Sequence, residues 1–359
     1  MRVGLCGRQR EHHDEQSRPP HLLEATTRRF HLQYPHGVRV VSTSNLPIDL
    51  ETQVRAQLPG TVVEVPPAAE HWIGLARSNV AEADALVCLL LDRIDEALIA
   101  RAPNLRVIAN CAVGYDNVDL AAATRAGIAV TNTPDVLTDA TAELTIALIL
   151  AAARRLPEGE ALVRSGSWPG WRLDQLIGQP IRGRTLGIVG MGRIGRGVAE
   201  RAIGLGMAIA YASQRDLALP FPARRLGVDE LFAEADVVSL HCPLTPETRH
   251  LVNEARLARM KPTAILVNTA RGGCVDDGAL AAALGEGRIF AAALDVFTAE
   301  PAIDPRLLAA PRLVLAPHLG SATTEARTQM AQLCADAVIA VLSGRRPANL
   351  VNKDVTLRG

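Results

Sequence analysis

Lysine is almost absent from this chain: Lys261 and Lys353 are the only two, and the other basic residues are arginines. The 38 basic side chains balance 38 acidic ones, so the formal net charge is zero. A chain without net charge has no global field that would attract nucleic acid or an anionic membrane. We therefore expect neither as a partner, and we interpret the arginine bias as a trace of genome composition.

Paired cysteines and long apolar runs are also missing. The six cysteines are scattered and include no CxxC pair. This pattern favours buried thiols in a reducing compartment, the cytoplasm, over a disulfide framework or a metal site. The longest apolar stretch, residues 144–153, is too short to cross a bilayer. Aromatic residues make up only 3% of the chain, whereas alanine, leucine and valine are abundant, as in α/β proteins with parallel strands.

Residues 1–37 differ in composition from the rest of the chain. They contain many of the histidines, show no regular hydrophobic period and lack the apolar stretch of a secretory signal. Acidic residues such as Glu11 and Asp14 argue against a transit peptide. We expect a disordered extension, or a start codon assigned too early, with the histidines forming a solvated tail rather than a metal site.

From Val38 onward, short apolar strands alternate with helices, which indicates a wound parallel sheet. The first series of expected strands is Val38–Ser42, Ala85–Leu90, Arg106–Ala109 and Ile128–Thr131, with helices over Leu50–Leu58 and Leu120–Ala126. The helix expected over Asp139–Arg155 is too rich in alanine, leucine and isoleucine for an exposed helix, so we expect it between domains or subunits. A second series of strands follows at Thr185–Val189, Ala208–Ala212, Val237–Leu240, Ile265–Asn268, Ala291–Leu294 and Leu313–Leu315, with helices over Asp277–Glu286 and Thr323–Leu342.

The strand at residues 185–189 leads directly into a G-x-G-x-x-G motif. Gly190 would make the tight turn, Gly192 would let the backbone approach a pyrophosphate, and Gly195 would let the following helix pack closely. The N-terminus of that helix offers unpaired N–H groups and a positive dipole end to phosphates. The motif predicts dinucleotide binding; the alternative is a structural turn that binds nothing.

Three further strands are each followed by an ionisable side chain. Arg271 comes after the strand at 265–268, Glu300 after 291–294, and His318 after 313–315. Ligands of open α/β sheets bind beyond the carboxyl ends of the strands. Reduction of a keto acid needs a cation for the carboxylate, an imidazole to supply a proton, and a carboxylate to keep that imidazole charged. Each residue alone could be merely structural, but their joint placement predicts a catalytic set.

With these motifs, residues 38–352 resemble the D-isomer-specific 2-hydroxyacid dehydrogenase family. Residues 110–119 (NCAVGYDNVD) are similar to its substrate-carboxylate loop, 189–195 to its cofactor fingerprint, and 241–248 (HCPLTPET) to its nicotinamide-ribose loop. Residues 267–272, 295–301 and 317–320 are similar to the segments that carry the catalytic Arg, Glu and His. Residues 133–143 and the pair Trp168 and Trp171 most resemble the glyoxylate/hydroxypyruvate reductase branch.

The resemblance implies a role for each matched position. Arg271 would bind and polarise a 2-oxo acid, His318 would donate the proton, and Glu300 would hydrogen-bond His318. The substrate would also meet Ala112, Val113, Gly114 and Trp171, although Trp168 or ordinary interface packing would account equally well for the tryptophans. Asp295 would border the nicotinamide or stabilise a turn. The implied cofactor contacts are Gly190, Met191, Gly192, Arg193, Ile194, Gly195, Ser213, Gln214, Arg215, His241, Cys242, Pro243, Thr248, Thr269, Ala270, Asp295 and Gly320.

The residues after the strand expected at 208–212 indicate which nicotinamide cofactor is preferred. NAD sites place Asp or Glu about 20 residues beyond the glycines. Here Ser213, Gln214 and Arg215 follow the strand, and Asp216 comes slightly late. Because Ser213 and Arg215 could bind a 2′-phosphate, we predict that NADP(H) is preferred. The alternative is that Arg215 stacks on adenine and NAD(H) also serves.

The family resemblance further implies two doubly wound parallel-sheet domains, a Rossmann cofactor domain inserted in a flavodoxin-like substrate domain. The substrate domain would comprise residues 38–138 and 322–359, the cofactor domain 139–321, and two copies would form a homodimer. Two other functions stay open. One is a phosphoglycerate dehydrogenase-like enzyme acting on another 2-hydroxy acid, and the other is a non-catalytic NAD(H)-sensing corepressor of the same fold. A formate dehydrogenase is disfavoured because that branch lacks the Glu–His pair.

Overall fold

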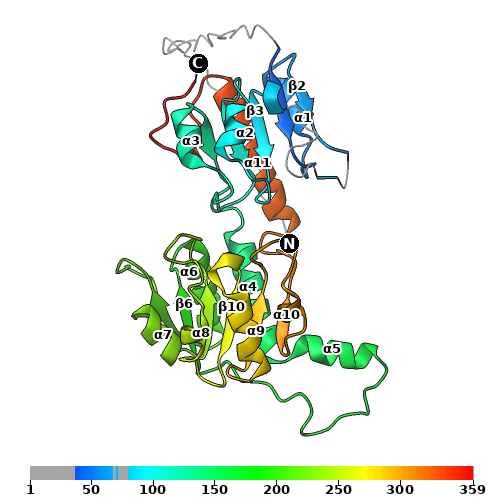
Figure 1. The fold of residues 1–359 in the computed structure, drawn as a ribbon, viewed down its shortest axis with the longest axis vertical. Helices are drawn as coiled ribbons and strands as arrows, with labels where there is room; N and C mark the ends of the chain where they lie inside the picture. The colour runs from blue at the N-terminus through cyan, green and yellow to red at the C-terminus, as the bar shows by residue number, and fades with distance from the viewer. Residues whose placement is uncertain (1–36, 68–69, 72–79, 359) are drawn as a thin grey trace, which may run out of the picture. The chain divides into compact units, whose positions relative to one another are not determined.

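The computed structural model describes residues 37–67, 70–71 and 80–358, so the extension expected over residues 1–37 lies almost wholly outside the described residues. Within them, the chain forms two parallel β-sheets with helices on both faces (Figure 1). This confirms the fold class expected from the sequence. None of the helices in the described part of the chain has the length and apolar character that a membrane span requires.

The first sheet has five strands in the order β2-β1-β3-β4-β5. Its strands are β1 (Arg39–Ser42), β2 (Val62–Glu64), β3 (Ala85–Cys88), β4 (Val107–Asn110) and β5 (Ala129–Thr131). Helices α1 (Leu50–Gln57) and α11 (Thr324–Leu342) cover one face, where Val338 packs with Val87 and Val107. Helices α2 (Glu96–Ala100) and α3 (Leu120–Arg125), with the 3₁₀ turn η2 (Val80–Glu82), cover the other.

The second sheet has seven strands in the order β12-β11-β10-β9-β6-β7-β8. They are β6 (Thr185–Val189), β7 (Ala208–Ala212), β8 (Arg224–Arg225), β9 (Val237–Leu240), β10 (Ile265–Asn268), β11 (Ala291–Leu294) and β12 (Leu313–Leu315). Strand β6 pairs with β7 on one side and with β9 on the other. The strand order therefore reverses at β6, and a ligand crevice is expected beyond its carboxyl end.

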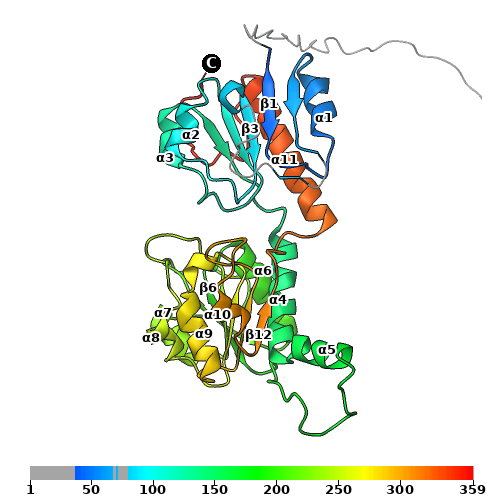
Figure 2. The ribbon, with the colours of Figure 1, turned by 45° about the vertical axis from the view of Figure 1, so that its right-hand side comes forward.

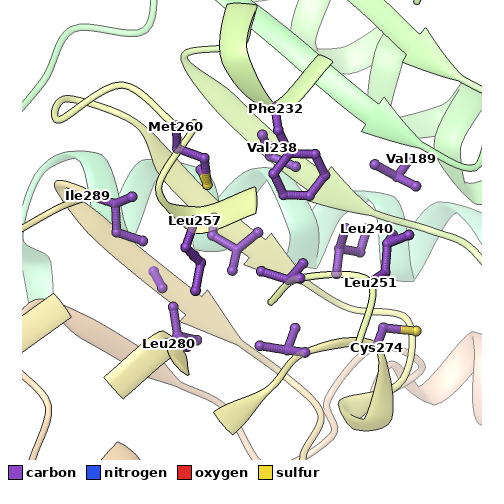
Figure 3. Close-up of a cluster of buried hydrophobic side chains, with 14 of the residues drawn as sticks. Val189, Phe232, Val238, Leu240, Leu251, Leu257, Met260, Cys274, Leu280 and Ile289 are labelled. Carbon is purple, nitrogen blue, oxygen red and sulfur yellow. The ribbon is translucent and has the colours of Figure 1, made fainter. Parts of the chain in front are cut away.

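Helices also cover both faces of the second sheet. On one face lie α4 (Thr138–Ala153) and α6 (Arg193–Gly204), which pack side by side against the central strands (Figure 2). On the other lie α7 (Val228–Glu234), α8 (Glu254–Leu257) and α9 (Asp277–Gly285). Their side chains Phe232, Leu257 and Leu280 pack with Val238 and Leu240 of β9 (Figure 3). Short elements complete this half: α5 (Leu156–Arg164), α10 (Pro305–Leu308) and the 3₁₀ turn η3 (Gly272–Cys274).

One expected helix ends earlier than the sequence indicates. The helix expected over residues 139–155 stops at Ala153, because Arg155 adopts a left-handed conformation with φ of 53° and starts α5. The helix interior matches its composition, since Ala142, Ile149 and Ala152 are buried. The residues after α11 pair with the first sheet, because Val130 N–H donates to Asn352 Oδ1 at 2.8 Å. The domain boundaries at 138/139 and 321/322 stay a prediction.

Candidate active site

The loop after β6 combines a sharp turn with an uncapped helix end. Gly190 has φ of 96°, which a side chain would strain, and α6 begins at Arg193 with Gly192 as its N-cap. No side chain caps this helix. The first N–H groups of α6 are therefore directed beyond the strand end without a side-chain acceptor, as a phosphate site requires.

The three glycines of the motif differ in what a side chain would meet. A Cβ on Gly190 would lie 2.6 Å from the carbonyl oxygen of His241, and one on Gly195 would lie 2.3 Å from that of Gly190. A Cβ on Gly192 would meet nothing within 4 Å. Gly190 and Gly195 are thus required by the fold itself. The space beside Gly192 is open and fits the close approach of a pyrophosphate.

A cavity of about 1100 Å³ lies beyond the carboxyl ends of β6, β7 and β9. This volume is slightly above the range of about 300–1,000 Å³ that is usual for small-molecule sites, and it suits a dinucleotide. The expected cofactor residues that line it are Gly190, Met191, Gly192, Ser213, Gln214, Arg215, His241, Cys242, Pro243 and Thr248. Three expected cofactor residues do not line this cavity. Arg193 forms an ion pair with Asp135, and Ile194 and Gly195 lie within α6.

The rim after β7 carries two arginines. Arg215 is exposed, and the side chain of Arg225, on the edge strand β8, donates to the carbonyl oxygens of Ser213 at 3.1 Å and Gln214 at 3.2 Å. Asp216 accepts a hydrogen bond from the Tyr211 hydroxyl at 3.0 Å. The sequence did not single out Arg225, because two exposed arginines carry no strand signal. Arg225 adds a second positive charge to this rim, beside that of Arg215.

The loop after β9 is largely neutral where it lines the cavity. Burial lowers the pKa of His241 to about 4, and its Nε2 lies 2.8 Å from Ser239 Oγ. The hydrogen bond with Cys274, together with burial, raises the pKa of Cys242. Thr248 Oγ1 donates to the Pro243 carbonyl oxygen at 2.6 Å and fixes the turn. An imidazole and a thiol that stay uncharged at neutral pH form a low-polarity wall for a ring or ribose.

Two loops from different strands bring an imidazole and a carboxylate together. His318 Nδ1 lies 2.8 Å from Glu300 Oε2, and Glu300 Oε1 accepts from the Phe297 N–H at 2.9 Å. Burial raises the pKa of Glu300, but the hydrogen bonds from His318 and Phe297 outweigh it, with a further contribution from Arg271, so the net shift is downward. Glu300 is therefore held as a carboxylate. Its pairing leaves the Nε2 atom of His318 for a ligand.

The turn that carries His318 is held by Asp295. His318 has φ of 55°, an uncommon conformation for a residue with a side chain. The Asp295 carboxylate accepts from the N–H groups of Leu319 at 2.6 Å and Gly320 at 2.8 Å. Burial raises the pKa of Asp295 despite these bonds. These contacts agree with the alternative interpretation of Asp295 as a residue that stabilises a turn. They also fix the position of the Gly320 backbone.

Arg271 lies against the loop after β4. Its Nε donates to Asp116 Oδ1 at 2.9 Å and its Nη1 to the Ala270 carbonyl oxygen at 2.8 Å. A Cβ on Gly114 would lie 1.6 Å from Nη2, so the guanidinium rests on a bare peptide. The loop is held by Asn132 Nδ2, which donates to the Val113 carbonyl oxygen at 2.8 Å, and by the Thr133 N–H, which donates to that of Ala112. Of the expected substrate residues, Gly114 thus lies against Arg271, and Ala112 and Val113 belong to the same loop.

Helix α4 contacts the loops that carry Arg271 and His318 through hydroxyl groups. Thr145 Oγ1 lies 3.0 Å from Thr269 Oγ1, two residues before Arg271, and Thr141 Oγ1 donates to the Gly320 carbonyl oxygen at 2.9 Å. All three threonines are buried. The sequence predicted α4 as a buried helix but offered no reason to pair these hydroxyls.

Trp171, expected at the substrate pocket, lies on the segment after α5 and is 79% exposed. Trp168 is 51% exposed and donates from Nε1 to Gln175 Oε1 at 3.2 Å. Helix α5 lies beside β12, since Pro157 and Ala161 line one cavity together with Leu313 and Val314. Within the described ranges, no three His, Cys, Asp or Glu side chains gather as metal ligands.

Comparison with known proteins identifies the family. Residues 146–320 match the family model described as D-isomer specific 2-hydroxyacid dehydrogenase, NAD binding domain. The glyoxylate reductase of Thermococcus litoralis is 50% identical over 289 residues, which are 79% of this chain and 87% of that protein. The glyoxylate reductase of Aeropyrum pernix is 52% identical over 299 residues, 81% of this chain and 88% of that protein.

Solved structures show the same architecture. A protein of Thermus thermophilus superposes with a TM-score of 0.81 at 46% identity, covering 88% of this chain and 100% of the other. The NADPH-dependent glyoxylate/hydroxypyruvate reductase of Sinorhizobium meliloti, in complex with NADP and malonate, superposes with a TM-score of 0.77 at 31% identity. That match covers 90% of this chain and 99% of the other.

Proposed function

The chain belongs to the D-isomer-specific 2-hydroxyacid dehydrogenase family, and from that premise we propose that it reduces glyoxylate or hydroxypyruvate with NADPH. The family makes it an NAD(P)-dependent dehydrogenase of a 2-oxo acid; the substrate and the preferred cofactor are the proposal. The product is the 2-hydroxy acid, of D configuration where it is chiral. The observation that carries the proposal is the His318–Glu300 pair, with Arg271 close enough to lower the pKa of Glu300.

Each of the three side chains has a defined part in the proposed reaction. The nicotinamide supplies a hydride when bound. Arg271 holds the substrate carboxylate and polarises the carbonyl, and charge-assisted hydrogen bonds suit both tasks. The Nε2 atom of His318 gives its proton to the carbonyl oxygen, since Nδ1 is occupied by Glu300. The Glu300 carboxylate orients the ring and stabilises the imidazolium before the transfer.

A substrate panel tests this proposal. The purified protein is mixed with NADPH and, in turn, glyoxylate, hydroxypyruvate, pyruvate and phosphohydroxypyruvate, and nicotinamide absorbance is followed. We expect the highest kcat/KM with glyoxylate or hydroxypyruvate, and D-glycerate from hydroxypyruvate by chiral chromatography. A preference for the phosphorylated acid would replace the proposal with a phosphoglycerate dehydrogenase-like activity. Absence of turnover with every acid would favour the corepressor.

The preference for NADPH rests on the rim after β7. Arg215 and Arg225 are close to Ser213, and Asp216, the next residue after Arg215, is bonded to the Tyr211 hydroxyl. Guanidinium groups favour a 2′-phosphate, and a free carboxylate there would repel it. The Sinorhizobium meliloti enzyme, described as NADPH-dependent, is a related example. Equal or higher kcat/KM with NADH would contradict the preference.

A homodimer is proposed from the exposed apolar surface of α5 and the segment after it. No residue of α5 is buried, and Trp171, Leu173 and Ile177 are 79%, 82% and 60% exposed. Contiguous apolar exposure of this kind marks an interaction surface. A 16-residue helix is about 24 Å long, so α4 separates this surface from the His318 turn of the same chain. A second copy is therefore the occupant that would give Trp171 a place near a substrate pocket.

The oligomeric state tests the dimer. Sedimentation velocity at micromolar concentration should give a dimer for the native chain and a monomer for a Leu173→Arg, Ile177→Arg variant. Glu254→Arg, at an exposed position of α8 on the other face of the seven-stranded sheet, is a control that should leave the dimer intact. A monomeric native chain would contradict the proposal.

A further inference from the structure

The guanidinium of Arg271 is not held by its own loop alone. Its Nε donates to Asp116 Oδ1 at 2.9 Å, although 155 residues separate the two in sequence. Arg271 follows β10 of the seven-stranded sheet, and Asp116 lies in the loop after β4 of the five-stranded sheet. The side chains are 24% and 41% exposed, so the ion pair is partly screened from water. One contact thus joins the loop of the cation to the loop expected to receive the substrate carboxylate.

The remaining contacts of Arg271 determine which edge of the guanidinium can bind a substrate carboxylate. Nη1 donates to the Ala270 carbonyl oxygen, and Nη2 rests on the peptide of Gly114, where a Cβ would be 1.6 Å away. A guanidinium has five N–H groups in a rigid plane. With Nε engaged by Asp116, the donors that remain for a carboxylate are on Nη1 and Nη2. The position of Asp116 therefore determines how the plane is turned.

Asp116 is itself part of a rigid loop. Asn110 Nδ2 donates to the Gly114 carbonyl oxygen at 2.8 Å, and Asn117 Nδ2 donates to Asn110 Oδ1 at 3.1 Å and to the Leu89 carbonyl oxygen at 3.1 Å. Asn110 is fully buried at the end of β4. The loop is tied to β4 and to the end of β3, so the carboxylate of Asp116 is carried by the sheet rather than by a free surface segment.

We propose that Asp116 is a positioning residue for the reaction: it orients Arg271 so that the Nη edge meets the substrate carboxylate and carbonyl. This inference rests on the proposed function. The ion pair spans the two sheets, so it aligns the guanidinium only while the loops after β4 and β10 are together. The Asp116 carboxylate also offsets part of the positive charge of Arg271. Removing Asp116 therefore loses orientation without losing attraction for an anion.

The test compares two substitutions that separate orientation from charge. Asp116→Ala removes the acceptor for Nε, and we expect kcat with glyoxylate or hydroxypyruvate to fall about 100-fold, the effect of a misplacement of about 1 Å. KM should change less than about 3-fold, because Arg271 remains. Asp116→Asn keeps an oxygen acceptor for Nε, and its kcat should stay within about 5-fold of the native value. This split between kcat and KM, with rescue by asparagine, would not arise from a general loss of folding.

Two controls complete the experiment. Glu96→Ala removes an ion pair with Arg125 at 2.7 Å, of which both members are more than half exposed, and should leave kcat unchanged. Thermal unfolding of Asp116→Ala should lie within about 2 °C of the native protein, since pairs at this exposure add little stability. An alanine variant with kcat within about 3-fold of native, or alanine and asparagine variants equally impaired, would overturn the inference.

The test of Asp116 gives an answer even if glyoxylate and hydroxypyruvate are not the substrates. The native protein is assayed first on the substrate panel, and the variants are compared on whichever 2-oxo acid it reduces best. Binding of oxamate, a 2-oxo acid analogue, to the NADPH complex is measured by calorimetry as a readout independent of turnover. We expect oxamate to bind Asp116→Ala within about 3-fold of native affinity, but with a changed enthalpy. An affinity loss as large as that of Arg271→Ala would overturn the positioning role, whatever the substrate.

Discussion

His318 and Glu300 form a hydrogen bond of 2.8 Å between side chains that follow two different strands. The carboxylate is itself oriented by the Phe297 N–H, and the His318 backbone is held in a left-handed turn by Asp295. The imidazole is therefore constrained from both its ring and its backbone. A ring fixed in this way presents one nitrogen outward in a defined direction.

Substitution of Glu300 by Gln should change the pH dependence of catalysis. The pKa of Glu300 lies below its ordinary value of 4.5, so the carboxylate is ionised across the working range and supports a charged imidazole. Without that charge the imidazolium loses its partner, and we expect the alkaline limb of the kcat/KM profile to move to lower pH, with kcat reduced about 10-fold or more. Glu286→Gln, on an exposed residue at the end of α9, should behave as native. A profile unchanged by Glu300→Gln would contradict the role of this carboxylate.

His318→Ala should separate chemistry from cofactor binding. Loss of a general acid lowers rates by about 100- to 10,000-fold. The dissociation constant of NADPH, measured by fluorescence titration, should change less than about 3-fold, because His318 lies outside the residues that line the cofactor cavity. The exposed His250 provides a matched control, and its alanine variant should keep native kcat. If His318→Ala retains kcat, the proton donor must be another group.

The two glycines Gly192 and Gly195 should respond differently to alanine. A Cβ on Gly195 would lie 2.3 Å from a carbonyl oxygen, so Gly195→Ala should lower the melting temperature by several degrees. A Cβ on Gly192 meets nothing within 4 Å, so Gly192→Ala should keep the melting temperature but weaken NADPH binding about 10-fold or more. Thermal unfolding and cofactor titration of the same samples provide both readouts. If Gly192→Ala binds NADPH as tightly as the native chain, no phosphate approaches that glycine.

Arg215→Ala should affect the two nicotinamides unequally. The guanidinium would pair with the 2′-phosphate, which only NADPH carries. We expect kcat/KM for NADPH to fall about 10- to 100-fold and kcat/KM for NADH to change less than about 3-fold. Arg249→Ala, at an exposed site after the β9 loop, should leave both unchanged. Equal losses with both cofactors would indicate stacking on adenine instead.

The sequence predicted the second sheet more completely than the first. The six strands expected from Thr185 to Leu315 have the bounds observed, because each is a short apolar run, mostly buried in all but β12, with a glycine, a polar residue or a proline within two residues of its end. Strand β8 was missed because Arg224 and Arg225 are exposed and give no hydrophobic signal. Strand β2 was missed because its three residues are only partly buried.

Side-chain partners were harder to predict than strands. The order of residues along the chain placed Arg271, Glu300 and His318 at strand ends, but it carried no information on the contact of Arg271 with Asp116, which comes from a different sheet. The same applies to Thr145 and Thr269, which meet across a helix–sheet interface. Contacts of this kind depend on how the elements pack, and the local sequence pattern does not encode that packing.

The outermost strand β8 also has a consequence for self-association. It contributes only Arg224 and Arg225, both exposed, to the border of the seven-stranded sheet. A short border strand with two adjacent positive charges is a poor template for a further strand, because an incoming copy would bring like charges into register. This border therefore resists the uncontrolled sheet extension that leads to fibrils, while other surfaces remain free to form specific contacts.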